Sequence, residues 1–186
     1  ERALRRAGLP LRMTEGFNPH PRISFPTALG VGIESLDEVM EFDLADWVVL
    51  DDVAVRLRGQ LPEGLDVVRL EMGNPHRAAQ AREVEYRLAA SDHVRSDPRW
   101  SHAALESLLA RGEIPVTRKR KGKDKSVDIR PFILAARLDS GSLMLRLRAG
   151  NAGSVHPEEV LGALGFNLPG DRGEFQIVRT KVLLDE

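Results

Sequence analysis

The sequence predicts an α+β protein made of two modules that share one order of strands and helices. Short apolar stretches with period-two alternation indicate strands, as in 39–44, where Met40, Phe42 and Leu44 alternate with acids. Amphipathic helical patterns separate these stretches. The polar, alanine-rich stretch 73–82 interrupts the pattern, which then restarts. At 186 residues the chain has room for two small cores.

The first module, residues 1–75, is expected to lack an opening strand. Gly8 is a suitable residue to end a helix, and Pro62-Glu63-Gly64 forms a turn. Residues 16–21 contain two prolines and are expected to be irregular. The expected elements are a helix over 1–7, a strand over 9–14, a strand over 39–44, a helix from 51 to 60 and a strand over 65–72.

The second module, residues 84–186, follows a linker over 76–83. Pro131 is expected to bend a long strand, and Pro157 to open a helix that Gly165 ends. The expected elements are strands over 84–89, 114–119, 127–138, 143–148 and 175–184, with helices over 101–110 and from 157 to 165. The order is that of a ferredoxin-like (βαββαβ) module. We therefore predict two tandem ferredoxin-like modules, the first without its opening strand.

The composition excludes several classes of site. The sequence has no cysteine, which removes disulfides, thiolate metal sites, iron–sulfur ligation and cysteine nucleophiles. The histidines have no spacing that favours a shared metal, so no metal site and no cofactor are predicted. No apolar run approaches the length of a membrane span, and we expect a cytoplasmic protein that does not contact membranes.

The charge is unevenly distributed along the chain. Residues 28–75 contain eleven acids and three bases, whereas residues 114–150 contain ten bases and three acids. The segment 118–125 is the most basic and is expected at a hairpin tip, where it binds RNA or another polyanion. The alternative is a solvated loop that only maintains solubility. The predicted nucleic-acid-binding residues are Arg118, Lys119, Arg120, Lys121, Lys123, Lys125 and Arg130.

Arg146 and Arg148 extend this basic patch if their strand lies beside it. No aromatic residue interleaves with the bases, so the sequence gives no support for stacking of single-stranded bases there. Contact is expected mainly with the RNA backbone.

A second candidate site is the loop containing His20. One interpretation makes His20 a general acid–base or a donor to phosphate, with Arg22 as its charge partner. The other is a rigid structural loop in which Phe17 and Phe25 fill the core while Asn18 bonds its own backbone. The residues of interest are Gly16, Phe17, Asn18, Pro19, His20, Pro21, Arg22 and Ser24.

A third candidate is the loop 150–157, which leads into a helix. A helix N-terminus can receive phosphate, but Glu158 and Glu159 already complement the helix dipole. An ordinary capped helix is the favoured interpretation.

The stretch 16–25, preceded by Arg2 to Pro10, resembles the bacterial radical SAM-linked protein family. Weaker matches follow at 127–130, 153–161 and 178–181. The family is a domain of unknown function, found beside or fused to a B12-type radical SAM protein and often near a ribonuclease of the E/G class. Its members carry an earlier strand and a Ser-His-Leu-Asp-like segment, which this sequence does not contain.

The resemblance implies an accessory protein in RNA modification or metabolism, with a radical SAM protein as partner. Three functions follow from the sequence, in order of preference. The first is an RNA-binding accessory protein without catalytic activity of its own. The second is a protein-interaction scaffold for the radical SAM partner, using the acidic residues of 28–75. The third is an RNA-processing or RNA-modifying enzyme that uses the His20 loop.

Overall fold

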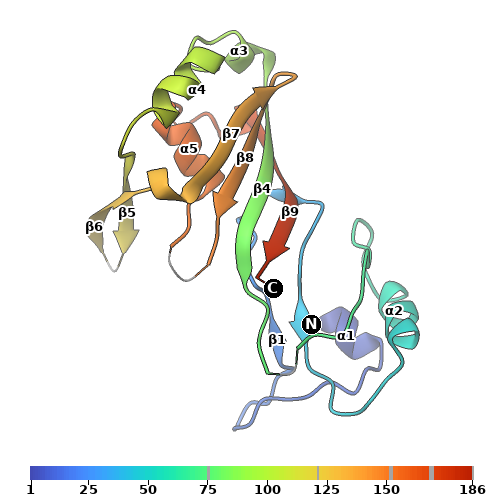
Figure 1. Ribbon diagram of the computed structural model, residues 1–186. Coiled ribbons are helices and arrows are strands. Elements are labelled where there is room, and N and C mark those ends of the chain that lie inside the picture. Colours follow the sequence, from blue (N-terminus) through green and yellow to red (C-terminus); the bar gives the residue numbers. More distant parts are fainter. Residues whose placement is uncertain (75, 121, 151–152, 168–169, 186) are drawn as a thin grey trace. The chain divides into compact units, whose positions relative to one another are not determined.

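The computed structural model has a mixed α+β fold, which confirms the predicted fold class (Figure 1). It describes residues 1–186 except 75, 121, 151–152, 168–169 and 186. Its contacts group the chain into two compact units. Unit 1 consists of residues 1–26 and 39–79, and unit 2 of residues 27–38 and 80–186.

Unit 1 is built around a small apolar core between two helices. Its elements are α1 (Arg2–Arg6), β1 (Ile23–Ser24), β3 (Glu41–Phe42) and α2 (Leu50–Arg58). Strands β1 and β3 pair antiparallel. Gly8 ends α1 with a φ of 64°, a value that a residue with a side chain rarely adopts. The buried members of the core are Leu4, Ala7, Leu9, Val53 and Leu57.

The alternation in 39–44 gives the predicted face, because Met40, Phe42 and Leu44 all pack against this core. Two other expected strands do not form as predicted. Residues 9–14 make only isolated bridges at Leu11 and Met13. The described residues of 65–72 contain no strand.

Local hydrogen bonds replace the expected strand at 65–72. Arg58 Nη2 donates to the Val67 carbonyl at 2.8 Å, and the Val67 amide donates to the Asp66 carboxylate at 2.7 Å. Both backbone groups of Val67 are therefore satisfied without a neighbouring strand. Unit 1 has one pair of two-residue strands in its described part, and the tandem ferredoxin-like arrangement is not confirmed.

Unit 2 contains a five-stranded sheet with the order β2-β9-β4-β8-β7. The last four strands of this order pair antiparallel, and β2 pairs parallel with β9. The strands are β2 (Glu34–Ser35), β4 (Ala81–Ala90), β7 (Ile133–Asp139), β8 (Ser142–Arg148) and β9 (Phe175–Leu184). The helices are α3 (Asp92–Arg95), α4 (His102–Leu109), α5 (Pro157–Ala163), and the 3-10 turns η1 (Arg130–Phe132) and η2 (Arg172–Glu174).

One face of this sheet forms the main core with α4 and α5 (Figure 1). Strand β4 buries alternate residues, and Leu88 lies opposite Leu143 of β8. Leu108 of α4 and Leu161 of α5 are buried in the same cluster. Trp100, Phe166 and Phe175 extend it with ring contacts between 5.2 and 6.0 Å.

Residues 27–38 pack with unit 2, whereas the sequence grouped them with the first module. Strand β2 pairs with β9, and Ile33 is buried in the main core. Arg179 of β9 is 1% exposed and donates to Glu38 at 2.8 Å and to the Ala28 carbonyl at 2.6 Å. This buried guanidinium fixes the segment to the sheet.

A separate two-stranded sheet consists of β5 (Pro115–Arg120) and β6 (Lys123–Asp128). The sequence predicted one bent strand over 127–138, but the chain divides here into β6, η1 and β7. Asp128 Oδ1 accepts from the amides of Ile114 and Arg130 at 2.7 and 3.0 Å, and Pro131 has no amide to donate. The hairpin is thereby separated from the main sheet (Figure 1).

Candidate nucleic-acid interface

The β5–β6 hairpin places basic residues opposite one another across its two strands. Arg118 is paired with Lys125, and Arg120 with Lys123. Like charges at opposite positions of an antiparallel pair destabilise it. Near its turn the hairpin therefore holds positive charge that an anion would stabilise.

Three lysines of this hairpin are exposed: Lys119, Lys123 and Lys125. Lys119 lies opposite Asp124 in the register, but no ion pair joins them. Among the described residues, none bonds to the ammonium group of these three lysines. They are available to an anionic ligand. The side chain of Arg120 and the whole of Lys121 lie outside the described part of the chain.

Arg118 holds the hairpin to α5 instead of facing solvent. Its Nε and Nη2 donate to the two carboxylate oxygens of Glu159 at 2.6 and 2.7 Å, and Nη2 also donates to the Ser154 carbonyl. Burial would raise the pKa of Glu159, but the hydrogen bonds from Arg118 and the His156 amide hold it below its ordinary value. Arg118, which was predicted to contact phosphate, therefore has an anchoring role in the structure.

Arg130, also predicted to bind nucleic acid, makes hydrogen bonds within the protein. Its Nε donates to the Leu109 carbonyl at 3.0 Å and its Nη1 to the Ile133 carbonyl at 3.3 Å. These bonds join the end of α4 to the start of β7. The guanidinium is committed to backbone oxygens and does not extend the basic surface.

Arg146 and Arg148 lie on the main sheet, which does not include the hairpin strands. Arg146 is paired with Glu83 of the neighbouring strand β4. Arg148 is exposed. These arginines belong to the face of the sheet that α4 and α5 leave open, and they do not continue the hairpin surface along a shared strand.

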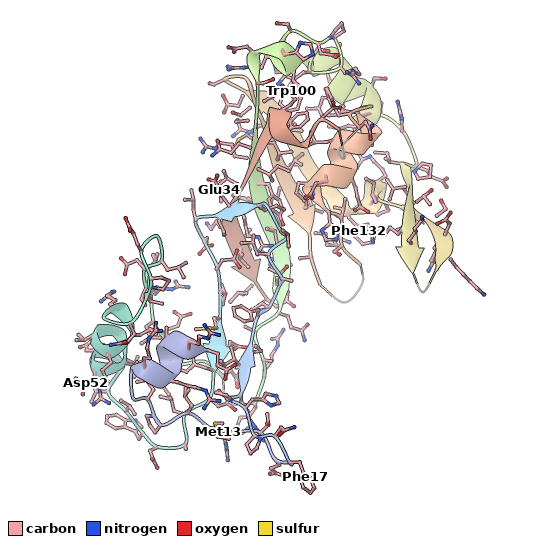
Figure 2. All side chains as sticks on the ribbon, turned by 180° about the vertical axis from the view of Figure 1, so that it is seen from behind. Met13, Phe17, Glu34, Asp52, Trp100 and Phe132 are labelled. Carbon is pink, nitrogen blue, oxygen red and sulfur yellow. The ribbon has the colours of Figure 1, made fainter. Side chains whose placement is uncertain are left out.

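In the His20 loop, the residues that enter the loop pair with those that leave it. Met13 bridges Pro21, and the Thr14 amide donates to the His20 carbonyl at 2.8 Å. The His20 amide donates back to Thr14 Oγ1 at 3.1 Å. Phe17 is fully exposed at 107% and points away from unit 1 at the loop tip (Figure 2), and Phe25 is 57% exposed. The expectation that these rings fill the core is wrong.

The imidazole of His20 is oriented by its own loop. Nδ1 lies 3.1 Å from the Asn18 carbonyl, which can only accept, so a hydrogen bond between them requires the proton on Nδ1 and leaves Nε2 as the second functional atom. Thr14 Oγ1 lies 3.3 Å from the same Nδ1. Arg22 faces Asp43 at 3.9 Å instead of His20. In the described residues the structure does not bring His20 and Arg22 together as a pair.

The helix α5 has the capped N-terminus that the sequence favoured. The Glu159 carboxylate accepts from the His156 amide at 2.9 Å. The same carboxylate binds Arg118, so one acid both caps the helix and anchors the hairpin. Residues 151–152 of the loop before α5 lie outside the described part of the chain.

Other candidate sites are few in the described part of the chain. No group of three or more His, Cys, Asp or Glu residues there has a metal-binding arrangement. None of the described helices has the length and apolar character needed to span a bilayer. A depression of about 350 Å³ lies beside the start of α4, lined by Trp100, His102 and the β7–β8 turn, and it includes neither His20 nor Arg22.

Comparison with known families matches residues 1–157 to the model of DUF2344, described as an uncharacterized protein conserved in bacteria. The chain belongs to the DUF2344 family. No curated protein matches the chain, and no solved structure does. The DUF2344 match includes both the His20 loop and the hairpin, and it ends at Pro157, before Glu159 and Arg179.

Two important residues of this DUF2344 chain were missed by sequence reasoning. Glu159 was read only as a helix-dipole acid, although it holds Arg118. Arg179 was noted only as part of a motif, although it is the one buried charged residue among those described. The signal that could have identified it is an arginine that directly follows the apolar residues Ile177 and Val178 in a strand pattern.

Proposed function

We propose that this DUF2344 protein binds RNA through the β5–β6 hairpin, as an accessory protein of a radical SAM system. The observation that supports it is the set of exposed lysines on a hairpin that places Arg118 opposite Lys125 and Arg120 opposite Lys123. The anchor through Arg118 and Glu159 keeps this surface in a defined position. Lys119, Lys123 and Lys125 bind phosphates, and Arg118 does not.

Charge provides the free energy for this binding. Six of the residues from 118 to 125 are basic, and none of these is aromatic. Neutralising the exposed lysines with phosphates relieves repulsion across the strands and releases counterions from the RNA. Such binding depends strongly on salt and only weakly on sequence.

The proposed association with a radical SAM protein comes from the family resemblance of residues 16–25 and of the weaker motifs. The sequence has no cysteine, so the partner supplies the cluster with which radical SAM chemistry begins. The protein holds the RNA that the partner modifies. We include tandem ferredoxin-like modules in this proposal; the order β9-β4-β8-β7 in unit 2 supports one of them.

The test is replacement of the three hairpin lysines by serine in the intact chain: Lys119→Ser, Lys123→Ser and Lys125→Ser together. Binding of a short single-stranded RNA is measured by fluorescence anisotropy between about 50 and 200 mM salt. The slope of log K against log salt should become less steep by about 2, from roughly 0.7 for each lost contact with single strands.

The matched control removes Arg87, Arg148 and Lys181, three exposed bases of unit 2 on the main sheet. No described residue is paired with them. This control should keep the slope of the unaltered protein. An equal loss of slope in both triple variants would show a general charge effect and contradict the hairpin site.

A scaffold for the radical SAM partner is the second candidate, and exposed apolar residues in unit 1 favour it. Trp47, Val55 and Val68 are 83%, 68% and 86% exposed. Scattered exposed apolar residues are ordinary, but a protein-binding surface formed by such residues would be contiguous. Co-purification of the two proteins after nuclease treatment, with loss of the complex in Trp47→Ala, would favour the scaffold.

A further inference from the structure

Residues 12–25 of unit 1, here named the aromatic loop, carry a combination of side chains that the hairpin lacks. Phe17 is fully exposed, and Phe25 is 57% exposed. Arg12, His20 and Arg22 are exposed on the same loop. Aromatic rings interleaved with cations are typical of surfaces that bind single-stranded nucleic acid by stacking.

The aromatic loop is held in place before any ligand arrives. Its arms are joined by the Met13–Pro21 bridge and by reciprocal hydrogen bonds between Thr14 and His20 at 2.8 and 3.1 Å. Pro19 and Pro21 restrict the backbone further. A preorganised loop loses little conformational entropy on binding, which makes an exposed ring at its tip an effective contact.

The charge around the aromatic loop favours an anionic ligand. Residues 1–26 contain five arginines and two glutamates, whereas residues 39–79 contain eight acids and four arginines. By sequence the aromatic loop belongs to the basic part of an otherwise acidic unit. Arg22 of this loop lies 3.9 Å from Asp43, whereas Arg12 has no acidic partner among the described residues. Trp47, the other exposed aromatic residue of unit 1, is close in sequence to Asp46, Asp51 and Asp52 instead.

We propose that the aromatic loop is a base-stacking site for single-stranded RNA. Phe17 provides the principal stacking face and Phe25 a second. Arg12 contacts a flanking phosphate, and His20 Nε2 faces a base edge because Nδ1 is bound to the Asn18 carbonyl. The inference rests on the proposed RNA-binding function but concerns a different site, and it supplies the base contacts that the hairpin cannot make.

The first experiment compares two ligands of equal length and charge: a short single-stranded RNA and an abasic oligonucleotide. Phe17→Ala in the intact chain should weaken binding of the RNA about tenfold and leave the abasic ligand within about twofold. The salt slope should not change, because no phosphate contact is lost. Trp47→Ala, a matched removal of an exposed ring from acidic surroundings, should change neither affinity.

A second measurement observes the contact directly. Phe17→Trp, combined with Trp47→Phe, places a reporter indole at the loop tip. Its fluorescence should be quenched by the RNA and not by the abasic oligonucleotide. The remaining Trp100 is buried and serves as an internal reference.

The outcomes separate this inference from the proposed function. A Phe17→Ala protein that binds RNA normally, or loses both ligands equally, overturns the stacking site while leaving the hairpin intact. If the lysine triple variant keeps its slope but Phe17→Ala still loses RNA, the hairpin fails and the stacking site stands. No RNA binding by the unaltered chain, with Phe17→Ala instead releasing the radical SAM protein, overturns both and identifies the loop as a protein contact.

Discussion

At the scale of the residue, the most informative side chain is Arg118, because its partner decides its role. A run of six bases in eight positions predicts a uniform basic surface. The structure separates Arg118, bound to Glu159 and the Ser154 carbonyl, from lysines that no described residue binds. Glu159 is 41 residues away in sequence, so no local pattern could predict this pairing.

Arg118→Ala should lower the free energy of unfolding by about 1–3 kcal/mol, because charged hydrogen bonds to a half-buried carboxylate are lost. Arg137→Ala removes an arginine from an exposed pair with Asp139 and should cost about 0.5 kcal/mol or less. Urea unfolding of both variants measures the difference. Equal costs would show that the Arg118–Glu159 pair does not anchor the hairpin.

A second prediction at the scale of the residue concerns Asp97 and the pH dependence of the protein's stability. Hydrogen bonds from the Arg99 side chain and amide lower the pKa of Asp97 from 3.8 to about 2. Because this folded-state pKa lies below the unfolded one, the carboxylate stabilises the fold above pH 4, and the contribution is lost as the pH falls toward 2.

The measurement for Asp97 is a carboxyl NMR titration, whose midpoint should be about 2. In urea unfolding, Asp97→Asn should be less stable than the unaltered protein at neutral pH. The difference should shrink as both are acidified below pH 4. A difference that stays constant with pH would contradict the charged hydrogen bonds.

At the scale of the element, glycines near α5 show how the loop before it is packed. A Cβ at Gly153 would lie 2.5 Å from Phe132 Cζ, and the φ of 130° is one that only glycine readily adopts. Gly162, inside α5, has nothing within 4 Å of the same position. The ring of Phe132 thus uses the space that the missing side chain leaves.

Gly153→Ala should therefore destabilise the protein by about 1–3 kcal/mol, through overpacking and backbone strain. Gly162→Ala should instead stabilise it by about 0.5–1 kcal/mol, because alanine is the better helix former. Thermal unfolding of the two variants gives opposite shifts of Tm. A neutral Gly153→Ala would mean that Phe132 can move aside without cost.

The elements that the sequence predicted best are those with a strong local pattern. Strands β4, β8 and β9 show alternation or apolar runs, and α4 begins where the Ser101 hydroxyl caps the Ala104 amide. Strand β2 could not be predicted, because it has two residues and its partner β9 lies far along the chain. Residues 65–72 have the composition of a strand but no neighbour to pair with.

At the scale of the whole molecule, two separate segments of the chain form unit 2. Residues 27–38 join its sheet before the chain returns to unit 1 at Val39. The Leu36 amide donates to the Arg179 carbonyl, and the Val182 amide donates to the Asp37 carboxylate. No periodicity in the sequence can indicate such a crossing, since it depends on contacts between distant segments.

Glu38→Gln tests this attachment. Removing the charge opposite the buried Arg179 should lower the free energy of unfolding by about 3 kcal/mol, at the low end for buried pairs because Glu38 is 33% exposed. The Leu36 and Val182 amides should also exchange hydrogen faster. Glu34→Gln, at an exposed contact with Gln176, should have little effect on either measurement. Unchanged exchange at both amides would contradict the attachment.

Because unit 2 is formed by two separate segments, the protein cannot be divided into its units by a single cut. A fragment starting at Gln80 would contain most of unit 2, yet it would lose Ile33, Glu38 and all of β2. Its β9 edge would present unpaired backbone groups to other molecules, with Arg179 lacking a counter-ion, and such edges promote aggregation. Supplying residues 27–38 as a separate peptide should restore solubility to this fragment, as donor strands do for incomplete sheets.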